Sequence, residues 1–182
     1  MGQKVVVFGS FVVDLMARTP HLPVPGETVK GSIFKMGPGG KGFNQGVAAH
    51  KAGADVTMIT KLGRDSFANV ALDAMKELGM DTGKILYHDT VETGCALIMV
   101  DENSSQNEIV VISGACDTID DQDLASCEEE IKSAAYLLTQ LETNVDATAK
   151  AIDLAWQSGG KVVLNTCLLY TSPAKSWKRS AW

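Results

Sequence analysis

The chain is organised around the stretch GPGGKGFNQ, residues 37–45. Four of its first six residues are glycine, too many for the interior of a helix or a strand, but suited to a loop whose main-chain N–H groups a bound molecule can approach. The next residues, 44–52 (NQGVAAHKA), are small and apolar at helical spacing. We therefore predict a glycine loop that runs into a helix N-terminus, where free N–H groups and the helix dipole favour oxygen-rich ligands. Lys41 and Asn44 add a cation and an amide to this site, whereas the alternative is a tight turn before a closely packed helix start.

Outward from this loop, short apolar runs alternate with segments whose apolar residues recur at helical spacing. Strands are predicted at residues 4–8, 55–60, 85–88, 135–140 and 161–164, and helices at residues 44–52, 67–78, 124–132 and 144–157. This alternation is typical of a Rossmann-type α/β fold, with a doubly wound and mostly parallel sheet. Further strand pairs near residues 11–36 and 94–112, one of them a strand at 28–36 leading into the glycine loop, predict a second, smaller sheet.

Length and composition exclude several classes of protein. With 182 residues, 45% hydrophobic and 21% charged, the chain has the composition of one globular domain or of part of a larger one. A net charge of −6 argues against a general nucleic-acid binder, and no run approaches the roughly 20 apolar residues of a membrane span. The four cysteines and three histidines show no metal-ligand spacing, so we expect no metal site among them. Without a signal-peptide pattern, we expect a cytoplasmic protein with reduced thiols.

Two carboxylates lie close behind predicted strands. Asp14 interrupts the apolar run that comes after the strand at 4–8, and Glu142 follows the strand at 135–140. Open α/β sheets bind ligands beyond the carboxyl ends of their strands, so both side chains are predicted to line a cleft that grips a polyhydroxylated molecule. The alternatives are Asp14 on a solvent-facing strand edge and Glu142 as a charge that complements the N-terminus of the following helix.

The glycine stretch also fits the dinucleotide-binding pattern GxGxxG through Gly37, Gly39 and Gly42, but a single match is weak evidence. That pattern should follow the first strand directly, whereas roughly 30 residues intervene here. It also expects an acidic residue at the end of the next strand, where Thr60-Lys61 stand. The sequence contains no Gly-Lys-Ser/Thr phosphate-binding loop. A nicotinamide-dependent oxidoreductase of the Rossmann type is therefore an alternative function.

Five motifs follow one another along the chain: Gly9-Ser10 with Asp14 downstream, Pro25-Gly26-Glu27-Thr28, Gly39-Gly40-Lys41-Gly42-Phe43-Asn44-Gln45, Thr93-Gly94 before an apolar strand, and Gln140-Leu141-Glu142. In this order and spacing they resemble the ribokinase-like (PfkB) carbohydrate kinases, from about Lys4 to Asn165. The glycine motif is far more specific than GxGxxG. The resemblance implies a kinase that transfers the γ-phosphoryl group of ATP to a sugar hydroxyl, with Mg²⁺ and often a monovalent cation such as K⁺.

The same resemblance implies how the parts of such a kinase are arranged. The sugar would be held by residues of these motifs: Asp14, Gly39, Gly40, Lys41, Gly42, Asn44 and Glu142. The strand pairs near 11–36 and 94–112 would form a lid over the sugar, and in ribokinases the lid also makes the dimer contact. The implied partners are therefore a small sugar, ATP and a second copy of the chain.

The sequence departs from the family pattern at two places. Ribokinases carry an asparagine two residues before the aspartate, and Val12 stands there in this chain, which argues against ribose as the substrate. No Gly-Ala-Gly-Asp motif occurs, so the catalytic base, the anion hole and most of the nucleotide pocket are expected in a C-terminal half that the chain lacks. We therefore expect residues 1–165 to be the N-terminal part of a sugar kinase, inactive alone. The alternative of another class is a non-catalytic sugar-binding module.

Residues 166–182 are expected to be a non-native tail. The run CLLYTS at 167–172 resembles one reading frame of a common sequencing adapter, and a basic segment containing tryptophan follows it. An unusual natural C-terminus is the alternative.

Overall fold

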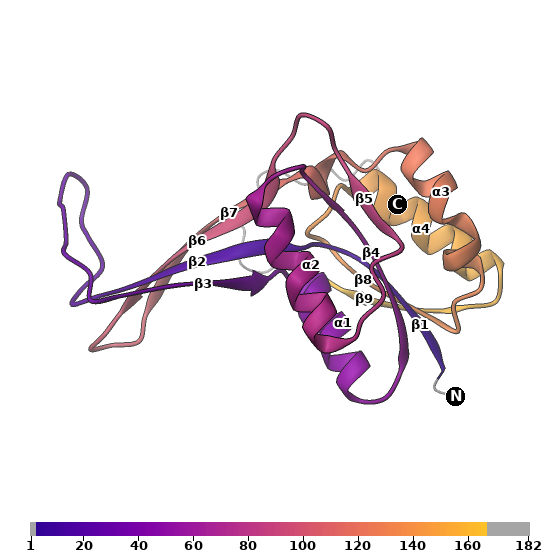
Figure 1. Ribbon diagram of the computed structural model, residues 1–182, viewed down its shortest axis with the longest axis horizontal. Helices are drawn as coiled ribbons and strands as arrows, with labels where there is room; N and C mark the ends of the chain where they lie inside the picture. Colours follow the sequence, from indigo (N-terminus) through magenta and orange to yellow (C-terminus); the bar gives the residue numbers. More distant parts are fainter. Residues whose placement is uncertain (1–2, 167–182) are drawn as a thin grey trace.

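The computed structural model describes residues 3–166, which form two β-sheets and four α-helices (Figure 1). The larger sheet has five strands in the order β5-β4-β1-β8-β9, and every neighbouring pair is parallel. Its strands are β1 (Lys4–Phe8), β4 (Asp55–Leu62), β5 (Ile85–Tyr87), β8 (Tyr136–Gln140) and β9 (Lys161–Asn165). The predicted parallel sheet of an α/β fold is confirmed.

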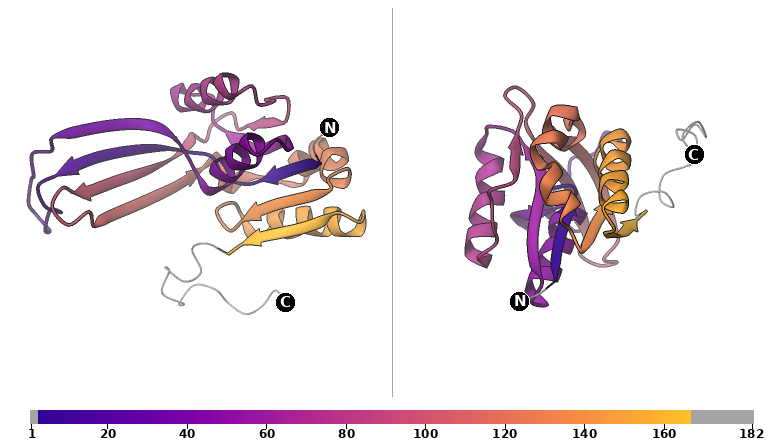
Figure 2. Two further views of the ribbon diagram at one scale, coloured as in Figure 1. Left: turned by 90° about the horizontal axis from the view of Figure 1, so that it is seen from below. Right: turned by 90° about the vertical axis from the view of Figure 1, so that its right-hand side faces the viewer.

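Helices cover both faces of this sheet (Figure 2). One face carries α1 (Lys41–Lys51) and α2 (Ser66–Leu78), and the other carries α3 (Asp121–Lys132) and α4 (Val145–Gln157), with a short 3₁₀ helix η1 (Ala115–Thr118) before α3. In β1, Val5 and Val7 face the first pair of helices, and Val6 and Phe8 face the second. Because successive side chains of a strand point to opposite faces, this β-branched run is buried on both sides.

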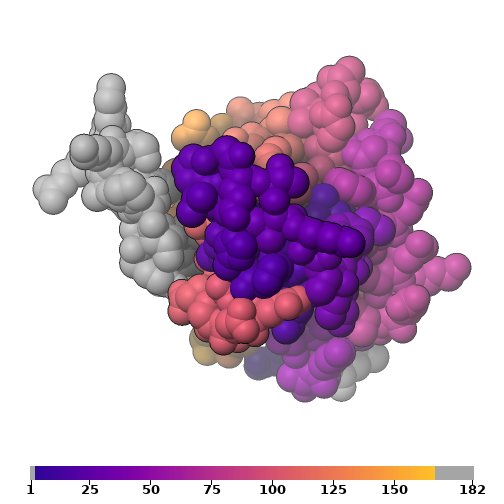
Figure 3. Space-filling view, turned by 90° about the vertical axis from the view of Figure 1, so that its left-hand side faces the viewer, coloured from indigo at the N-terminus to yellow at the C-terminus, as the bar shows by residue number. Residues whose placement is uncertain are grey.

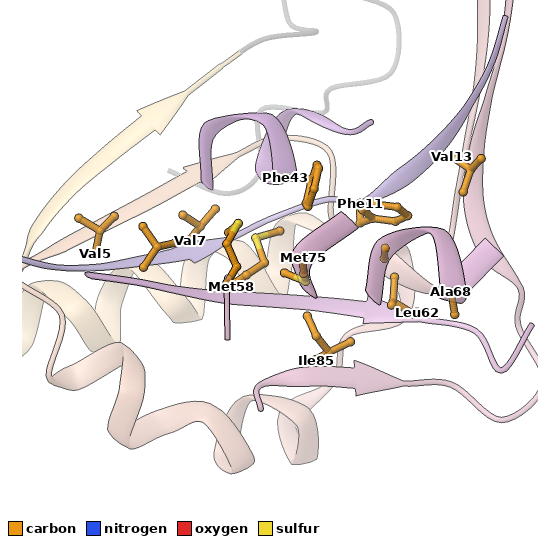
Figure 4. Packing of buried hydrophobic residues seen from close by; sticks show 13 residues of the cluster. Val5, Val7, Phe11, Val13, Phe43, Met58, Leu62, Ala68, Met75 and Ile85 are labelled. Atoms are coloured by element: carbon orange, nitrogen blue, oxygen red, sulfur yellow. The ribbon is translucent and has the colours of Figure 1, made fainter. Parts of the chain in front are cut away.

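The core beneath α1 and α2 links the sheet to the glycine stretch (Figure 4). Phe11, in the connection from β1 to β2, packs against Phe43 in the first turn of α1. The two rings meet edge to face with their centroids 5.3 Å apart, an arrangement that aromatic rings prefer. This contact fixes the start of α1 against the point where the chain leaves the five-stranded sheet.

The second sheet is smaller and mixed, in the order β3-β2-β6-β7, and projects away from the five-stranded sheet (Figures 1 and 2). It consists of β2 (Val12–Thr19), β3 (Ile33–Gly39), β6 (Thr93–Asp101) and β7 (Asn107–Gly114). Strand β2 pairs antiparallel with β3 and parallel with β6, and β6 pairs antiparallel with β7. The predicted smaller sheet is confirmed, and we call it the projecting sheet.

Two loops contact each other at the far end of the projecting sheet. The amide of Glu102 donates to the carbonyl of Thr19 over 2.9 Å, and the side-chain amide of Asn103 donates to the carbonyl of Pro20 over 2.8 Å. The loop 20–32 and the turn 102–106 therefore lie side by side at the tip, which faces the viewer in Figure 3.

The boundaries around the glycine stretch differ from the prediction. The strand expected at 28–36 is β3, which starts at Ile33 and continues through Gly37, Pro38 and Gly39, residues that were expected to form a loop. Strand β3 is at the edge of its sheet, where a proline is tolerated because one side of the strand needs no ladder hydrogen bonds. The helix expected to begin at Asn44 begins at Lys41.

No helix within residues 3–166 combines the length and the apolar character that a membrane crossing requires. Over the same range, no group of three or more His, Cys, Asp or Glu side chains is placed to hold a metal ion. The predicted non-native tail lies, except for Thr166, outside the described residues.

Candidate functional site

The residues predicted to bind a ligand gather where the carboxyl ends of β1 and β8 meet the root of the projecting sheet. The register of these two parallel strands pairs Phe8 with Thr139, so the segments that follow both strands emerge next to each other. Accordingly, Ser10 Oγ donates a hydrogen bond of 2.7 Å to Glu142 Oε2. This edge of a parallel sheet is where open α/β folds bind ligands.

Glu142 is the centre of a hydrogen-bonded cluster. Besides the bond from Ser10, it accepts bonds from the main-chain N–H of Lys41 over 2.9 Å and from Lys41 Nζ over 2.6 Å. Burial by itself would raise the pKa of Glu142, but the hydrogen bonds from Lys41 and Ser10 outweigh it, and the pKa lies below its usual value. The carboxylate therefore contacts α1. The following helix α4 is capped instead by Asn144, which accepts from the N–H of Ala147.

The N–H groups at the start of α1 are already engaged. Glu142 accepts from Lys41 N, Ser10 Oγ accepts from Gly42 N over 3.3 Å, and the carbonyl of Ser10 accepts from Phe43 N over 2.9 Å. The expectation that this helix N-terminus offers free N–H groups to a ligand is therefore wrong. Polar groups of the protein itself satisfy these donors, as a buried helix end requires.

Asp14 lies on β2, opposite Gly37 of β3, and is partly buried. Burial and the nearby Glu142 carboxylate raise its pKa above the usual value, and the Lys41 ammonium lowers it by a smaller amount. Gly39 provides the space for this carboxylate, because a Cβ there would collide with all three atoms of the Asp14 carboxyl group. The structure thus brings Asp14, Lys41 and Glu142 into one electrostatic neighbourhood.

Two other glycines of the stretch allow close packing. A Cβ on Gly40, whose φ is 91°, would lie 2.9–3.0 Å from atoms of the β1–β2 connection. A Cβ on Gly42 would lie 2.6–2.7 Å from atoms of Gly9 and Ser10. The interpretation as a closely packed helix start therefore applies to these positions, beside the site at Asp14.

Of the other predicted residues, Asn44 lies exposed on α1, three residues after Lys41 and so on the same side of the helix. Ser10 was not among the predicted site residues, although it joins Glu142 to the start of α1. Its position, a hydroxyl immediately after the Gly9 that ends the first strand, was the signal that could have revealed it.

Glu142 also lines a hollow of about 390 Å³ between β7 and the segment that joins β8 to α4. Its other lining residues are Val111, Ser113, Asp117, Leu141, Thr143, Asn144 and Val145. Two further hollows, of about 380 and 480 Å³, lie along α3 and α4 and contain none of the predicted site residues. Of these three hollows among residues 3–166, the one beside Glu142 adjoins the candidate site.

Known proteins resemble this chain in both sequence and fold. Residues 2–178 match the model of the pfkB family of carbohydrate kinases. The chain is 36% identical to the deoxyribokinase of Salmonella typhi over 88% of this chain and 52% of that protein, and 37% identical to the ribokinase of Mus musculus over 88% and 50%. The solved structure of the ribokinase from Giardia lamblia superposes with a TM-score of 0.81 at 28% identity, covering 91% of this chain and 52% of that one.

The chain spans about half the length of the curated relatives it matches. Within this span it has the parallel sheet, the two helix layers and the projecting sheet, with the glycine stretch placed at the root of the latter. The family model covers almost all of the chain. The chain therefore belongs to the pfkB family of carbohydrate kinases.

Proposed function

We propose that this chain forms the sugar-binding part of an ATP-dependent carbohydrate kinase, which transfers the γ-phosphoryl group of ATP to a sugar hydroxyl. One observation carries the proposal: the Asp14 carboxylate and the Lys41 ammonium lie within electrostatic reach of each other at the edge where α/β sheets bind ligands. Sugar hydroxyls both donate and accept hydrogen bonds, so a carboxylate beside an ammonium suits them.

Each predicted residue has a part in this proposal. Asp14 accepts hydrogen bonds from two sugar hydroxyls, and Lys41 and Asn44 donate to others from the same side of α1. Gly39, Gly40 and Gly42 keep the space around Asp14 and the start of α1 free of side chains. The projecting sheet serves as the lid that covers the sugar and keeps water away from it. Glu142 completes the cluster through its hydrogen bonds with Lys41 and Ser10.

ATP, Mg²⁺ and a monovalent cation such as K⁺ are the proposed cofactors of the whole enzyme. The described residues do not fit them, because the N–H groups of α1 that could take a phosphate are engaged by Ser10 and Glu142, and residues 3–166 contain no metal-ligand cluster. We propose that the groups holding ATP and its metal ion, and the catalytic base, belong to the part of these kinases that the chain does not span. The 182-residue polypeptide is then expected to show no sugar-dependent ATP turnover. We propose a cytoplasmic enzyme, since ATP is available there.

The substrate is proposed to be a sugar other than free ribose. Val12 precedes Asp14 by two residues on β2, so both side chains point from the same face of the strand. Val12 is 5% exposed, and it belongs to neither core cluster of the described residues, whereas Val13 on the opposite face does. Val12 thus places methyl groups on the same face of β2 as the Asp14 carboxylate, at the position where the resemblance to ribokinases leads one to expect an asparagine.

A second copy of the chain is the proposed partner of the projecting sheet. Five large apolar side chains lie exposed on one face of this sheet: Phe34, Met36, Leu97, Val110 and Ile112. Exposed apolar patches of this kind mark interaction surfaces. Light scattering should give the mass of a dimer for the wild type and the mass of a monomer for Val110→Lys. The mass of a monomer for both proteins would contradict the proposal.

The test of the proposed function is sugar phosphorylation by an active kinase that contains these residues. Asp14→Ala should lower kcat/KM for the sugar by roughly 5- to 150-fold, since unpaired sugar hydroxyls cost about 1–3 kcal/mol. The matched control is Asp153→Ala, which removes an exposed carboxylate on α4. Sugar kinetics that are equal in the two variants would remove Asp14 from the site.

A further inference from the structure

Helix α1 begins without a capping side chain of its own. Its N-cap residue, Gly40, offers no side chain, and no acidic residue lies in its first turn. The other three α-helices within residues 3–166 each begin at a side chain that accepts from their first turn: Asp65 for α2, Asp120 for α3 and Asn144 for α4. Helix α1 therefore depends on groups from elsewhere in the fold to satisfy its first N–H groups.

These groups come from the ends of β1 and β8. Ser10 accepts hydrogen bonds from the N–H groups of Gly42 and Phe43. Glu142 accepts one from the N–H of Lys41, although Glu142 and Lys41 are 101 positions apart in the sequence. The Glu142 carboxylate thus occupies the position that an anionic ligand takes at an uncapped helix N-terminus. It complements the positive end of the helix dipole while its second oxygen binds Lys41 Nζ.

Solvent exposure separates the tasks of Glu142 and Lys41. The side chain of Glu142 is 8% exposed and its two oxygens already accept three hydrogen bonds, whereas the side chain of Lys41 is 40% exposed. A ligand that arrives from solvent therefore reaches the Lys41 side chain more readily than the Glu142 carboxylate.

We propose that Glu142 is a positioning residue, which caps α1 from the end of β8 and holds the Lys41 ammonium in place for the sugar. The second half of this statement rests on the proposed function, and the capping of α1 does not. The hydrogen bonds from Lys41 and Ser10, which hold the pKa of Glu142 below its usual value, keep the cap charged over a wider range of pH.

The cap is tested by hydrogen exchange in the 182-residue chain, without sugar. Glu142→Ala should speed amide exchange at Lys41 and Gly42 by at least about tenfold, because a hydrogen-bonded network around a charged acceptor is lost. The amides of α2, which Asp65 caps, should keep their protection. Glu142→Gln retains an acceptor oxygen without the charge and should restore part of the protection at the start of α1.

The matched control is Glu130→Gln, which removes the charge of a glutamate paired with Lys84 at 2.7 Å and should leave the amides of α1 unchanged. Exchange at Lys41 and Gly42 that is no faster in either Glu142 variant than in this control would overturn the cap. If Glu142→Ala does not fold, the comparison of Glu142→Gln with Glu130→Gln decides the question alone.

A double-mutant cycle separates positioning from direct sugar binding. Calorimetry measures the affinity for D-ribose and for 2-deoxy-D-ribose in the wild type, Lys41→Met, Glu142→Gln and the double variant. If Glu142 acts through Lys41, the double variant loses no more affinity than Lys41→Met, whereas additive losses would overturn the positioning role. A wild-type chain that binds neither sugar excludes both pentoses as substrates, and hydrogen exchange then still decides the cap.

Discussion

Replacing Gly39 by alanine should displace the Asp14 carboxylate. Gly37 and Gly39 lie two residues apart on β3, face the same side of the strand, and do not have a positive φ, so alanine can adopt the backbone of either. A Cβ at Gly39 would collide with the carboxyl group of Asp14, whereas a Cβ at Gly37 meets no atom within 4 Å. Gly37→Ala is therefore a matched control with the same chemical change.

The structure sets the size of the two effects of Gly39→Ala. The Asp14 side chain can turn away from a new methyl group, so the free energy of unfolding should fall by less than the 1–3 kcal/mol that overpacking of a rigid core typically costs, ~1 kcal/mol or below. A displaced carboxylate cannot accept hydrogen bonds from sugar hydroxyls. Losing a charged partner costs about 1.5–3 kcal/mol, which corresponds to roughly 10- to 150-fold weaker sugar binding. Gly37→Ala should change neither quantity.

The assay combines calorimetric sugar affinity with urea unfolding for the wild type and the two glycine variants. Equal sugar affinity in Gly39→Ala and Gly37→Ala would refute the reasoning that this glycine keeps the place of the carboxylate. A loss of affinity in Gly39→Ala without one in Asp14→Ala would show that the collision acts through another group.

Four further predictions rest on individual side chains. Lys61→Ala leaves the Asp123 carboxylate, 2.5 Å from Lys61 Nζ in a largely buried pair, without its cationic partner, and should lower the free energy of unfolding by about 3–5 kcal/mol in urea titrations. A Lys61→Met, Asp123→Leu double variant should recover part of this stability, because leucine cannot accept the hydrogen bond that Asp123 takes from the N–H of Asp120 at the start of α3. The raised pKa of Asp14 means that its ionisation opposes folding, so Asp14→Asn should raise the melting temperature at pH 7 and lose this advantage as the pH falls below the usual pKa; an unchanged melting temperature at pH 7 contradicts this. The lowered pKa of Glu142 has the opposite effect, because its ionisation stabilises the folded state. This stabilisation should be present at neutral pH and be lost as the pH falls through the lowered pKa, and Glu142→Gln should abolish this pH dependence of the melting temperature. In an active kinase that contains these residues, Val12→Asn should improve the use of ribose relative to other pentoses and hexoses in kinetic assays. Ribose as the best substrate of the same kinase with Val12 would contradict the role given to this side chain.

The elements with strong local signals were predictable from the sequence. The β-branched run of β1 and the amphipathic pattern of α2, with Asp65 before it and Gly79 after it in the left-handed conformation, are all present in the structure. These signals are local because a cap or a buried strand is determined by residues within a few positions of one another.

The glycine stretch was predicted less well because glycine has several physical uses. Its density indicated a loop, but Gly37 and Gly39 belong to an edge strand, where the missing side chain of Gly39 leaves room for the Asp14 carboxylate. Gly40 and Gly42 serve close packing against the β1–β2 connection. A glycine in the sequence can indicate that a neighbouring group lies close to the backbone, but the sequence does not show which group this is.

The role of Glu142 lay beyond sequence reasoning for a related reason. Capping rules look for an acceptor within a few residues of the helix start, and by those rules α1 has none. The acceptor comes instead from a strand whose register beside β1 brings Glu142 next to Ser10. The sequence predicted that this carboxylate binds sugar hydroxyls, but in the structure its oxygens already accept three hydrogen bonds from Ser10 and Lys41. The Lys41 side chain is the more exposed member of the pair. A strand-end carboxylate beside a glycine loop therefore predicts where a site lies, whereas which group of that site meets the ligand depends on the hydrogen bonds already made within the fold.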